Sequence, residues 1–318
     1  MDNAICPDEP SSTTKFCTKE KPIIEERLED KFRTILFLPE GDSRKGKGGL
    51  RTKGYFKKSY SNKPLVSVIT VVFNGEKYLE ETIQSVITQT YDNVEYIIID
   101  GGSTDGTLDI IKKYDDKINY WVSEEDGSIY DAMNKGLKLA TGEYIGILNA
   151  DDFYEPFTIE KSLALIINNN VDYSVAKVQY VNTKNIISPI YPLEKNKIYQ
   201  EMFYPHISAF IPRIAYKKVG LFNTKFKIAG DHDMALRIHL AGFNAIYLDE
   251  IVGRLTENGI SAGISSNKES LNVAIENGQN IILAILTYIK QITKLGVAAV
   301  LPDMLVKFIQ KMKGSRFS

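Results

Sequence analysis

Four short apolar runs alternate with amphipathic segments between residues 64 and 150, and this alternation strongly constrains the fold. The runs are rich in β-branched residues, as buried strands are, and they cover residues 64–73, 94–100, 118–124 and 143–150. The intervening segments have the pattern of helices, and we expect Gly142 to cap the last of them at its carboxyl end. Alternating strands and helices predict an α/β fold with a mainly parallel sheet, whose ligand site lies at the carboxyl ends of the strands.

The bulk composition narrows the classes of function. The chain has 318 residues, of which 43% are hydrophobic, so it can bury a sizeable core. Lysine plus arginine (39) nearly balances aspartate plus glutamate (40), and we therefore expect no nucleic-acid partner. Cys6 and Cys17 lack metal-ligand spacing, which favours a reducing compartment. The sequence shows neither a secretory leader nor an apolar run of about 18 residues, so a cytoplasmic protein is expected.

Residues 1–63 form a basic N-terminal extension. Its last part, residues 41–63, carries eight lysines and arginines against one aspartate, a net charge of +7 on a glycine-spaced stretch. Such a stretch is typical of a solvated linker, and the alternative is contact with phosphates or anionic lipid. We expect the catalytic domain to follow at residues 64–255.

Residues 256–318 differ from both preceding regions. They comprise a loop and then apolar segments interrupted by lysines, with a net charge of +5 over residues 281–318. One interpretation is an amphipathic helix that lies among lipid headgroups. The other is a helix that packs on the catalytic domain with its lysines in water.

Two adjacent carboxylates, Asp151 and Asp152, end the fourth apolar run. Asp152 suits the N-cap of a following helix. Hard carboxylate oxygens also suit Mg²⁺ or Mn²⁺, because substrate phosphates and water can complete the coordination of such an ion. Both interpretations remain open at this point.

The segment at residues 97–107 places Asp100 at the end of the second run, directly before Gly101 and Gly102. The dinucleotide pattern GxGxxG is missing, which argues against a dehydrogenase. Asp100 could accept hydrogen bonds from a nucleotide base or ribose, while the glycines allow close approach. A plain turn is the alternative.

A helix is predicted to begin near Asp231, in the segment AGDHDMALRI. Asp231 and Asp233 would lie in its first turn, where a capping role explains them without any chemistry. Asp231 could instead act as a general base. His206 is one of three histidines, and a surface or core position is its default interpretation.

In order and spacing, these segments resemble glycosyltransferase family 2 over residues 64–262. The resemblance implies the GT-A fold, a nucleotide-diphospho-sugar transferase fold, with a helical C-terminal extension and an inverting reaction. It also implies that Val71, Phe73 and Asn74 hold the nucleotide and that Asp100 contacts it. Gly101 departs from the family pattern, in which a second aspartate is usual.

The segment at residues 123–152 is the most specific part, and it is similar to a bacterial subgroup that builds surface polysaccharides. Asn149-Ala150-Asp151 takes the place of the family's Asp-x-Asp motif, which implies Mn²⁺ or Mg²⁺ on Asp151. The resemblance implies Asp231 as the base, although the usual preceding glutamate is missing. It assigns the remaining site residues to the nucleotide sugar (Asp126, Asn134, Asn149, Ala150) and to the acceptor and diphosphate side (His206, Asp233, Ser261).

The function implied is transfer of a hexose or N-acetylhexosamine from a UDP-sugar to an undecaprenyl-diphosphate-linked saccharide, for O-antigen or capsule. The enzyme would be peripheral on the inner face of the cytoplasmic membrane, and an oligomer is left open. One alternative is a sugar-nucleotide-binding protein without transferase activity. Another is a sugar-phosphate nucleotidyltransferase, although such enzymes carry a glycine-rich basic loop where this chain has FNGEKYLEE.

Overall fold

A computed structural model describes residues 11–181, 183–189, 198–256 and 264–294. Its main sheet has six strands in the order β1-β4-β3-β2-β5-β9. The four inner strands are parallel, and β1 and β9 pair antiparallel at the edges. This confirms the mainly parallel sheet expected from the sequence. The bounds are β1 Gly46–Gly48, β2 Val66–Val72, β3 Val94–Asp100, β4 Tyr120–Ser123, β5 Tyr144–Asn149 and β9 Ile211–Pro212.

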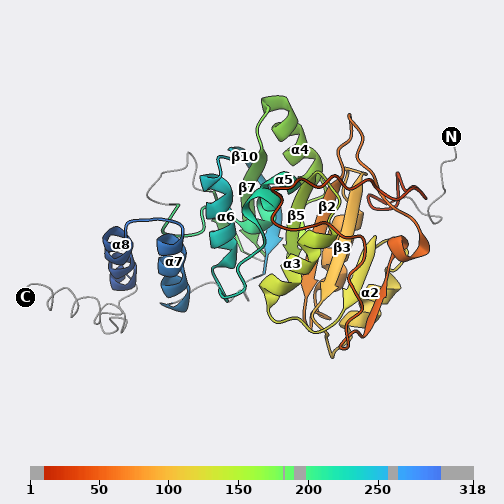
Figure 1. The fold of residues 1–318 in the computed structure, drawn as a ribbon, viewed down its shortest axis with the longest axis horizontal. Helices are drawn as coiled ribbons and strands as arrows, with labels where there is room; N and C mark the ends of the chain where they lie inside the picture. Colours follow the sequence, from red (N-terminus) through yellow and green to blue (C-terminus); the bar gives the residue numbers. More distant parts are fainter. Residues whose placement is uncertain (1–10, 182, 190–197, 257–263, 295–318) are drawn as a thin grey trace, which may run out of the picture.

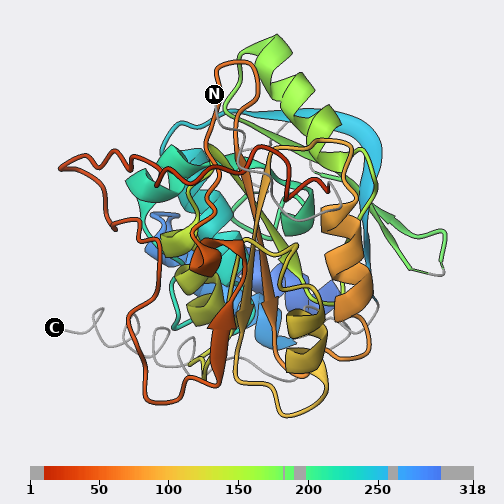
Figure 2. The same ribbon diagram turned by 90° about the vertical axis from the view of Figure 1, so that its right-hand side faces the viewer.

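Helices cover both faces of this sheet (Figures 1 and 2). Alternate side chains of a strand point to opposite faces, so Val68 and Ile69 of β2 belong to different core clusters. Val68 shares its cluster with α1 and α2, and Ile69 shares the other with α3. Burial on both faces explains the continuous apolar runs. The bounds are α1 Leu79–Ile87, α2 Thr107–Lys113 and α3 Ile129–Leu139.

The expected cap at Gly142 is wrong. Helix α3 ends at Leu139, and its C-cap is Ala140 in extended conformation. Gly142 instead lies against β2, where an added Cβ would be 2.6 Å from the backbone nitrogen of Ser67. The glycine is required by this close approach of two backbones.

A second, mixed sheet packs beside the first, with the order β6-β10-β7-β8. Helix α4 contacts β7 and β10. The sequence did not predict this sheet, because β6 and β8 have two residues each and β10 is only partly buried, with an irregular register. The bounds are β6 Phe153–Tyr154, α4 Thr158–Asn169, β7 Tyr173–Tyr180, β8 Ile186–Ile187 and β10 Ala245–Leu255.

The basic stretch before residue 64 is not a solvated linker. It contributes β1 and a 3-10 helix, Leu50–Lys53, and the red trace in Figure 2 follows the α/β half of the molecule. Arg51 is 3% exposed, and its guanidinium lies 2.6 Å from the buried Glu95 carboxylate. The same guanidinium donates to the carbonyls of Leu36 and Leu139. The charge pattern misled here because a buried, paired arginine has the same sequence signature as an exposed one.

Four helices follow the second half of the chain: α5 Arg213–Val219, α6 Gly230–Leu240, α7 Ile264–Glu276 and α8 Ile281–Lys294. Helices α7 and α8 share a small core that includes Leu271 and Tyr288, and α7 packs against α6. Ile282 and Leu286 on the outer side of α8 are exposed. Among the described residues, no helix has the length and apolar content needed to cross a bilayer. Most of the predicted basic segment, residues 295–318, lies outside the described residues.

Candidate active site

A cavity of about 1300 Å³ opens at the carboxyl ends of β2 and β5. Parallel strands end at the same edge of a sheet, so their final turns meet there. One side of the cavity, which we call the sheet wall, is lined by residues 71–75, 101, 126 and 149–152. The opposite side, the helix wall, is lined by residues 202–206, 227–228, 231 and 234–235.

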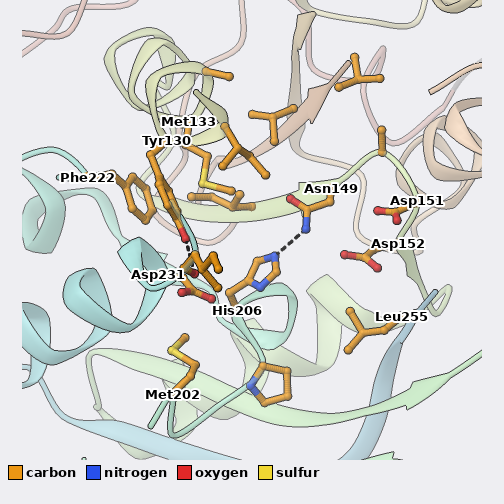
Figure 3. A pocket seen from close by; sticks show the side chains of 18 of the residues that line it. Tyr130, Met133, Asn149, Asp151, Asp152, Met202, His206, Phe222, Asp231 and Leu255 are labelled. Carbon is orange, nitrogen blue, oxygen red and sulfur yellow. Dashed lines mark hydrogen bonds between the residues drawn. The ribbon is translucent and has the colours of Figure 1, made fainter. Parts of the chain in front are cut away.

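Asp151 and Asp152 lie in the turn that leaves β5 (Figure 3). Asp151 Oδ2 accepts a hydrogen bond from Thr256 Oγ1 at 2.7 Å. Asp152 is 3% exposed, and burial together with the charge of Asp151 raises its pKa well above the ordinary value. The next helix, α4, begins only at Thr158, with Phe157 as its N-cap, so the interpretation of Asp152 as a cap is wrong. Both carboxylates line the cavity.

Asn149 and His206 join the two walls. Asn149 Nδ2 lies 3.2 Å from His206 Nε2. An amide nitrogen can only donate, so a hydrogen bond in this orientation requires the His206 tautomer whose Nε2 is unprotonated. Burial lowers the pKa of His206, while the carboxylates of Asp231 and Asp151 act in the opposite direction. In Figure 3 the ring lies between Asn149 and Asp231, so His206 is a site residue and not a surface histidine.

Asp231 lies in the first turn of α6 and faces the cavity. Its Oδ1 accepts the backbone N–H of His232 at 2.8 Å. The N-cap of α6 is Ala229, so Asp231 does not cap the helix. Gly230, which replaces the expected glutamate, packs against Tyr130, and an added Cβ would lie 2.7 Å from two of its ring carbons. The Asp231 residue therefore borders the cavity without serving as the cap of α6.

The nucleotide-side residues Val71, Phe73, Asn74 and Ala150 all line the sheet wall. Phe73 is 66% exposed, so its ring offers a face for stacking. Asn74 holds a left-handed backbone conformation with φ of 52°, and its Oδ1 accepts the N–H of Thr104 at 2.9 Å.

Asp126 also lines the sheet wall and pairs with Lys135. Burial raises the pKa of Asp126, and Lys135 only partly offsets this. An added Cβ on Gly101 would lie 3.3 Å from Asp126 Oδ2. An aspartate at position 101 would therefore crowd a second carboxylate, which explains this departure from the family pattern.

Three expected site residues are absent from the cavity lining. Asp100 is fully buried, and its carboxylate accepts hydrogen bonds from Ser103 and Ser123. The side-chain amide of Asn134 donates from Nδ2 to the carbonyl of Phe222 and accepts the N–H of Phe222 at Oδ1. Asp233 accepts from Arg237 and Asn277. The polar side-chain atoms of all three are bonded within the fold, and their assignment to the donor and acceptor sides stays a prediction. Ser261 lies outside the described residues.

Comparisons with known proteins place the chain in a family. The family model Glycosyl transferase family 2 matches residues 67–224. An uncharacterized glycosyltransferase of Mycobacterium tuberculosis is 33% identical over 183 residues, which cover 56% of this chain and 70% of that protein. The chain belongs to glycosyltransferase family 2.

Two other relatives show how far the similarity extends. An uncharacterized glycosyltransferase of Rickettsia typhi is 32% identical over 202 residues, which cover 59% of this chain and 62% of that protein. The chain thus spans less than two thirds of that relative. The putative teichuronic acid biosynthesis glycosyltransferase TuaG of Bacillus subtilis is 39% identical over 115 residues, 35% of this chain and 46% of TuaG.

Solved structures identify the fold of this family 2 chain as GT-A. Staphylococcus aureus TarS, in complex with UDP-GlcNAc, superposes with a TM-score of 0.58 at 21% identity, covering 71% of each chain. The mannosyltransferase PcManGT of Pyrobaculum calidifontis, in complex with GDP-Man and Mn²⁺, gives 0.56 at 20% identity, covering 81% of this chain and 82% of PcManGT. At these identities the likeness establishes the fold alone.

The turn after β5 fits a divalent cation. Asn149 Oδ1 is buried and has no hydrogen-bond partner among the described residues. The same turn carries two carboxylates, and the charge of Asp151 helps to raise the pKa of Asp152. Within the described ranges, no group of three or more His, Cys, Asp or Glu residues is arranged to hold a metal ion. That is compatible with Mg²⁺ or Mn²⁺, which commonly take one or two carboxylates and leave the remaining positions to phosphates and water.

No sequence pattern predicted the aromatic part of the cavity. Tyr130 and Phe222 stack with ring centroids 5.7 Å apart, and Met133, Met202 and Tyr216 lie beside them in the lining. Apolar residues at helical spacing have the same pattern whether they face a core or a cavity. Only long-range packing distinguishes the two.

Proposed function

We propose that this family 2 chain transfers a hexose or N-acetylhexosamine from a UDP-sugar to a lipid-linked saccharide, with inversion of configuration. The observation that carries the proposal is the pairing of the two walls across one cavity: the acidic turn after β5 faces Asp231, with His206 between them. A transferase requires this arrangement, because the leaving diphosphate and the attacking hydroxyl lie on opposite sides of the anomeric carbon.

The donor occupies the sheet wall. The exposed ring of Phe73 stacks on the base, and Val71 and Asn74 hold the nucleotide through the end of β2. We assign Asp126, which lines the same wall, to the sugar or ribose of the donor. The UDP-GlcNAc in the TarS complex supports a UDP-sugar as the donor, and the GDP-Man in the PcManGT complex makes GDP-mannose the first competitor to test.

Asp231 is the general base. It takes the proton from the acceptor hydroxyl as the oxygen attacks the anomeric carbon; the bond from that carbon to the diphosphate oxygen breaks, and the nucleoside diphosphate departs. One displacement of this kind inverts the configuration. When bound, a divalent cation on Asp151 would neutralise the charge of the departing diphosphate. The hydrogen-bonded pair of His206 and Asn149 lies between the base and the departing diphosphate. We propose that this pair excludes bulk water from the space between them.

The acceptor is a lipid-linked saccharide in O-antigen or capsule synthesis at the inner face of the cytoplasmic membrane. The printed role of TuaG in teichuronic acid biosynthesis supports a surface polysaccharide. The exposed apolar side chains of α8 support contact with lipid. Vesicles containing anionic lipid test the contact: Leu286→Asp on α8 should reduce co-sedimentation, whereas Ile167→Asp on α4 should not. The two side chains are a matched pair, at 58% and 57% exposed.

A thermal-shift panel tests the donor assignment. UDP-GlcNAc, UDP-glucose and GDP-mannose are compared with Mn²⁺ and with EDTA. A ligand at 100 times its Kd stabilises the native state by about 2.7 kcal/mol, so the true donor should raise Tm clearly, and more so with Mn²⁺. Stabilisation without turnover of any sugar nucleotide would favour a binding protein over a transferase. No stabilisation by any of them would contradict the proposal.

A further inference from the structure

The carboxylate of Glu269, on α7, binds the backbone directly before Asp231. Its Oε2 accepts the N–H groups of Ile228 at 2.8 Å and of Ala229 at 2.9 Å. Both oxygens accept the N–H of Lys227, at 3.0 and 3.1 Å. Three consecutive backbone donors that converge on one carboxylate form an anion-binding concavity, and such charge-assisted bonds are stronger than neutral ones. Glu269 therefore fixes the path of the chain into α6.

Helix α6 needs this carboxylate because its own sequence provides no cap. The first N–H groups of a helix have no partner within it, and the N-cap residue, Ala229, has no side-chain acceptor. A negative charge at this end also interacts favourably with the helix dipole. Glu269, far along the chain, accepts the N–H of the N-cap residue Ala229, as the glutamate at the third helical position does in a capping box.

The same short loop is held from its other side by α3. The hydroxyl of Tyr130 donates to the carbonyl of Ile228 at 2.7 Å, and the Tyr130 ring packs on Gly230. The backbone of residues 227–230 is therefore clamped between α3 and α7, and Asp231 follows at once. A change at either clamp displaces the Asp231 carboxylate relative to the cavity.

We propose that Glu269 is a positioning residue for Asp231, which makes α7 part of the reaction machinery as well as a packing element. The inference rests on the proposed role of Asp231 as the base. The reaction is sensitive to such placement, since a displacement of about 1 Å can cost roughly a hundredfold in rate. Glu269 acts on proton transfer alone, because the donor is held by the opposite wall.

Two variants and a matched control test this. Glu269→Gln and Glu269→Ala remove the anionic acceptor. Glu276→Gln lies on the same helix and breaks only an exposed ion pair with Lys225. Donor Kd, kcat for release of nucleoside diphosphate, and Tm are measured with the panel sugar nucleotide that the wild type turns over. We expect kcat to fall about ten- to a hundredfold in both Glu269 variants. Their donor Kd should stay within about twofold, and Glu276→Gln should match the wild type.

Tyr130→Phe tests the other clamp if Glu269→Ala fails to fold. It keeps the ring and removes the bond to Ile228, so it should give the same fall in kcat at unchanged donor Kd. Wild-type kcat in both Glu269→Gln and Tyr130→Phe would overturn the inference, as would parallel losses of kcat, donor binding and Tm. Absence of turnover in the wild type would instead contradict the proposed function.

Discussion

The two walls of the cavity are built in different ways. The sheet wall consists of the ends of β2 and β5 and of residues that follow β2, β3, β4 and β5, so each of its parts is a short stretch of chain at one edge of the sheet. The helix wall is assembled from segments far apart: residues 202–206, the start of α6, and a carboxylate from α7 that holds the latter. In the proposed mechanism, donor binding and proton transfer therefore rest on separable parts of the structure, and we expect them to fail separately.

The largest expected effect is on the helix wall. Asp231→Asn should lower kcat by roughly a thousandfold, because an amide cannot take the acceptor proton and general-base catalysis contributes about 10²–10⁴-fold. Donor Kd, measured by isothermal titration, should stay near the wild-type value. Asp249→Asn, at an exposed position of β10, is the control, and its kcat and donor Kd should equal those of the wild type. Turnover by Asp231→Asn at the wild-type rate would remove Asp231 from the mechanism.

Next in size is the buried ion pair at the amino end of β3. Arg51→Met should lower the free energy of unfolding by about 3 kcal/mol or more, because it leaves the Glu95 carboxylate buried without its partner. Lys53→Met breaks a more exposed pair with Asp115 and should cost less than about 1 kcal/mol. Urea denaturation measures both. Equal small losses would mean that residues 41–63 are dispensable to the sheet, as a linker would be.

The same pair predicts a pH dependence. Burial raises the pKa of Glu95, but Arg51, Ser67 and Thr141 outweigh it and hold the pKa below its ordinary value. A carboxyl with a lowered folded pKa stabilises the protein above the unfolded value, about 4.3, and this stability is lost as the pH falls through the folded pKa. Glu95→Gln should therefore flatten the acid limb of the stability curve. An unchanged acid limb in that variant would mean that other carboxyls set it.

A donor-side effect follows. Asp151→Asn should weaken Mn²⁺-dependent binding of the sugar nucleotide by about a hundredfold, because even outer-shell partners of a metal ligand cost roughly 10–100-fold. The difference between donor Kd with Mn²⁺ and with EDTA is the measurement. The variant should keep its affinity in EDTA, and a loss of equal size under both conditions would place Asp151 in the donor site without a metal.

The smallest effects compare one glycine from each wall. Gly230→Ala places a Cβ 2.7 Å from the Tyr130 ring and should cost about 1–3 kcal/mol of stability and lower kcat. Gly101→Ala meets Asp126 at 3.3 Å and should alter only donor Kd, by a few-fold at most. Thermal melts and single-substrate kinetics separate the two. Equal changes in stability, kcat and donor Kd in the two variants would mean that the two walls are mechanically coupled.

Local pattern alone predicted the four inner strands, their turns, and the placement of Asp151 and Asp231 at cavity-facing ends. Strand periodicity, turn residues and the family motif each involve residues that are close together in the chain, so they can be recognised from the sequence alone. The same signals could not show that the side chains of Asp100, Asn134 and Asp233 bond within the fold, because a polar residue near a site has the same pattern whether it points into the cavity or into the fold.

What the sequence by itself determined is the parallel sheet and the acidic turn at its edge, since both follow from residues adjacent in the chain. The tertiary structure decided that Arg51 is buried on Glu95, that His206 bridges the two walls, and that Glu269 holds the entry to α6. Each of these contacts joins residues at least 40 positions apart. Such contacts depend on how whole elements pack, and local periodicity carries no record of it.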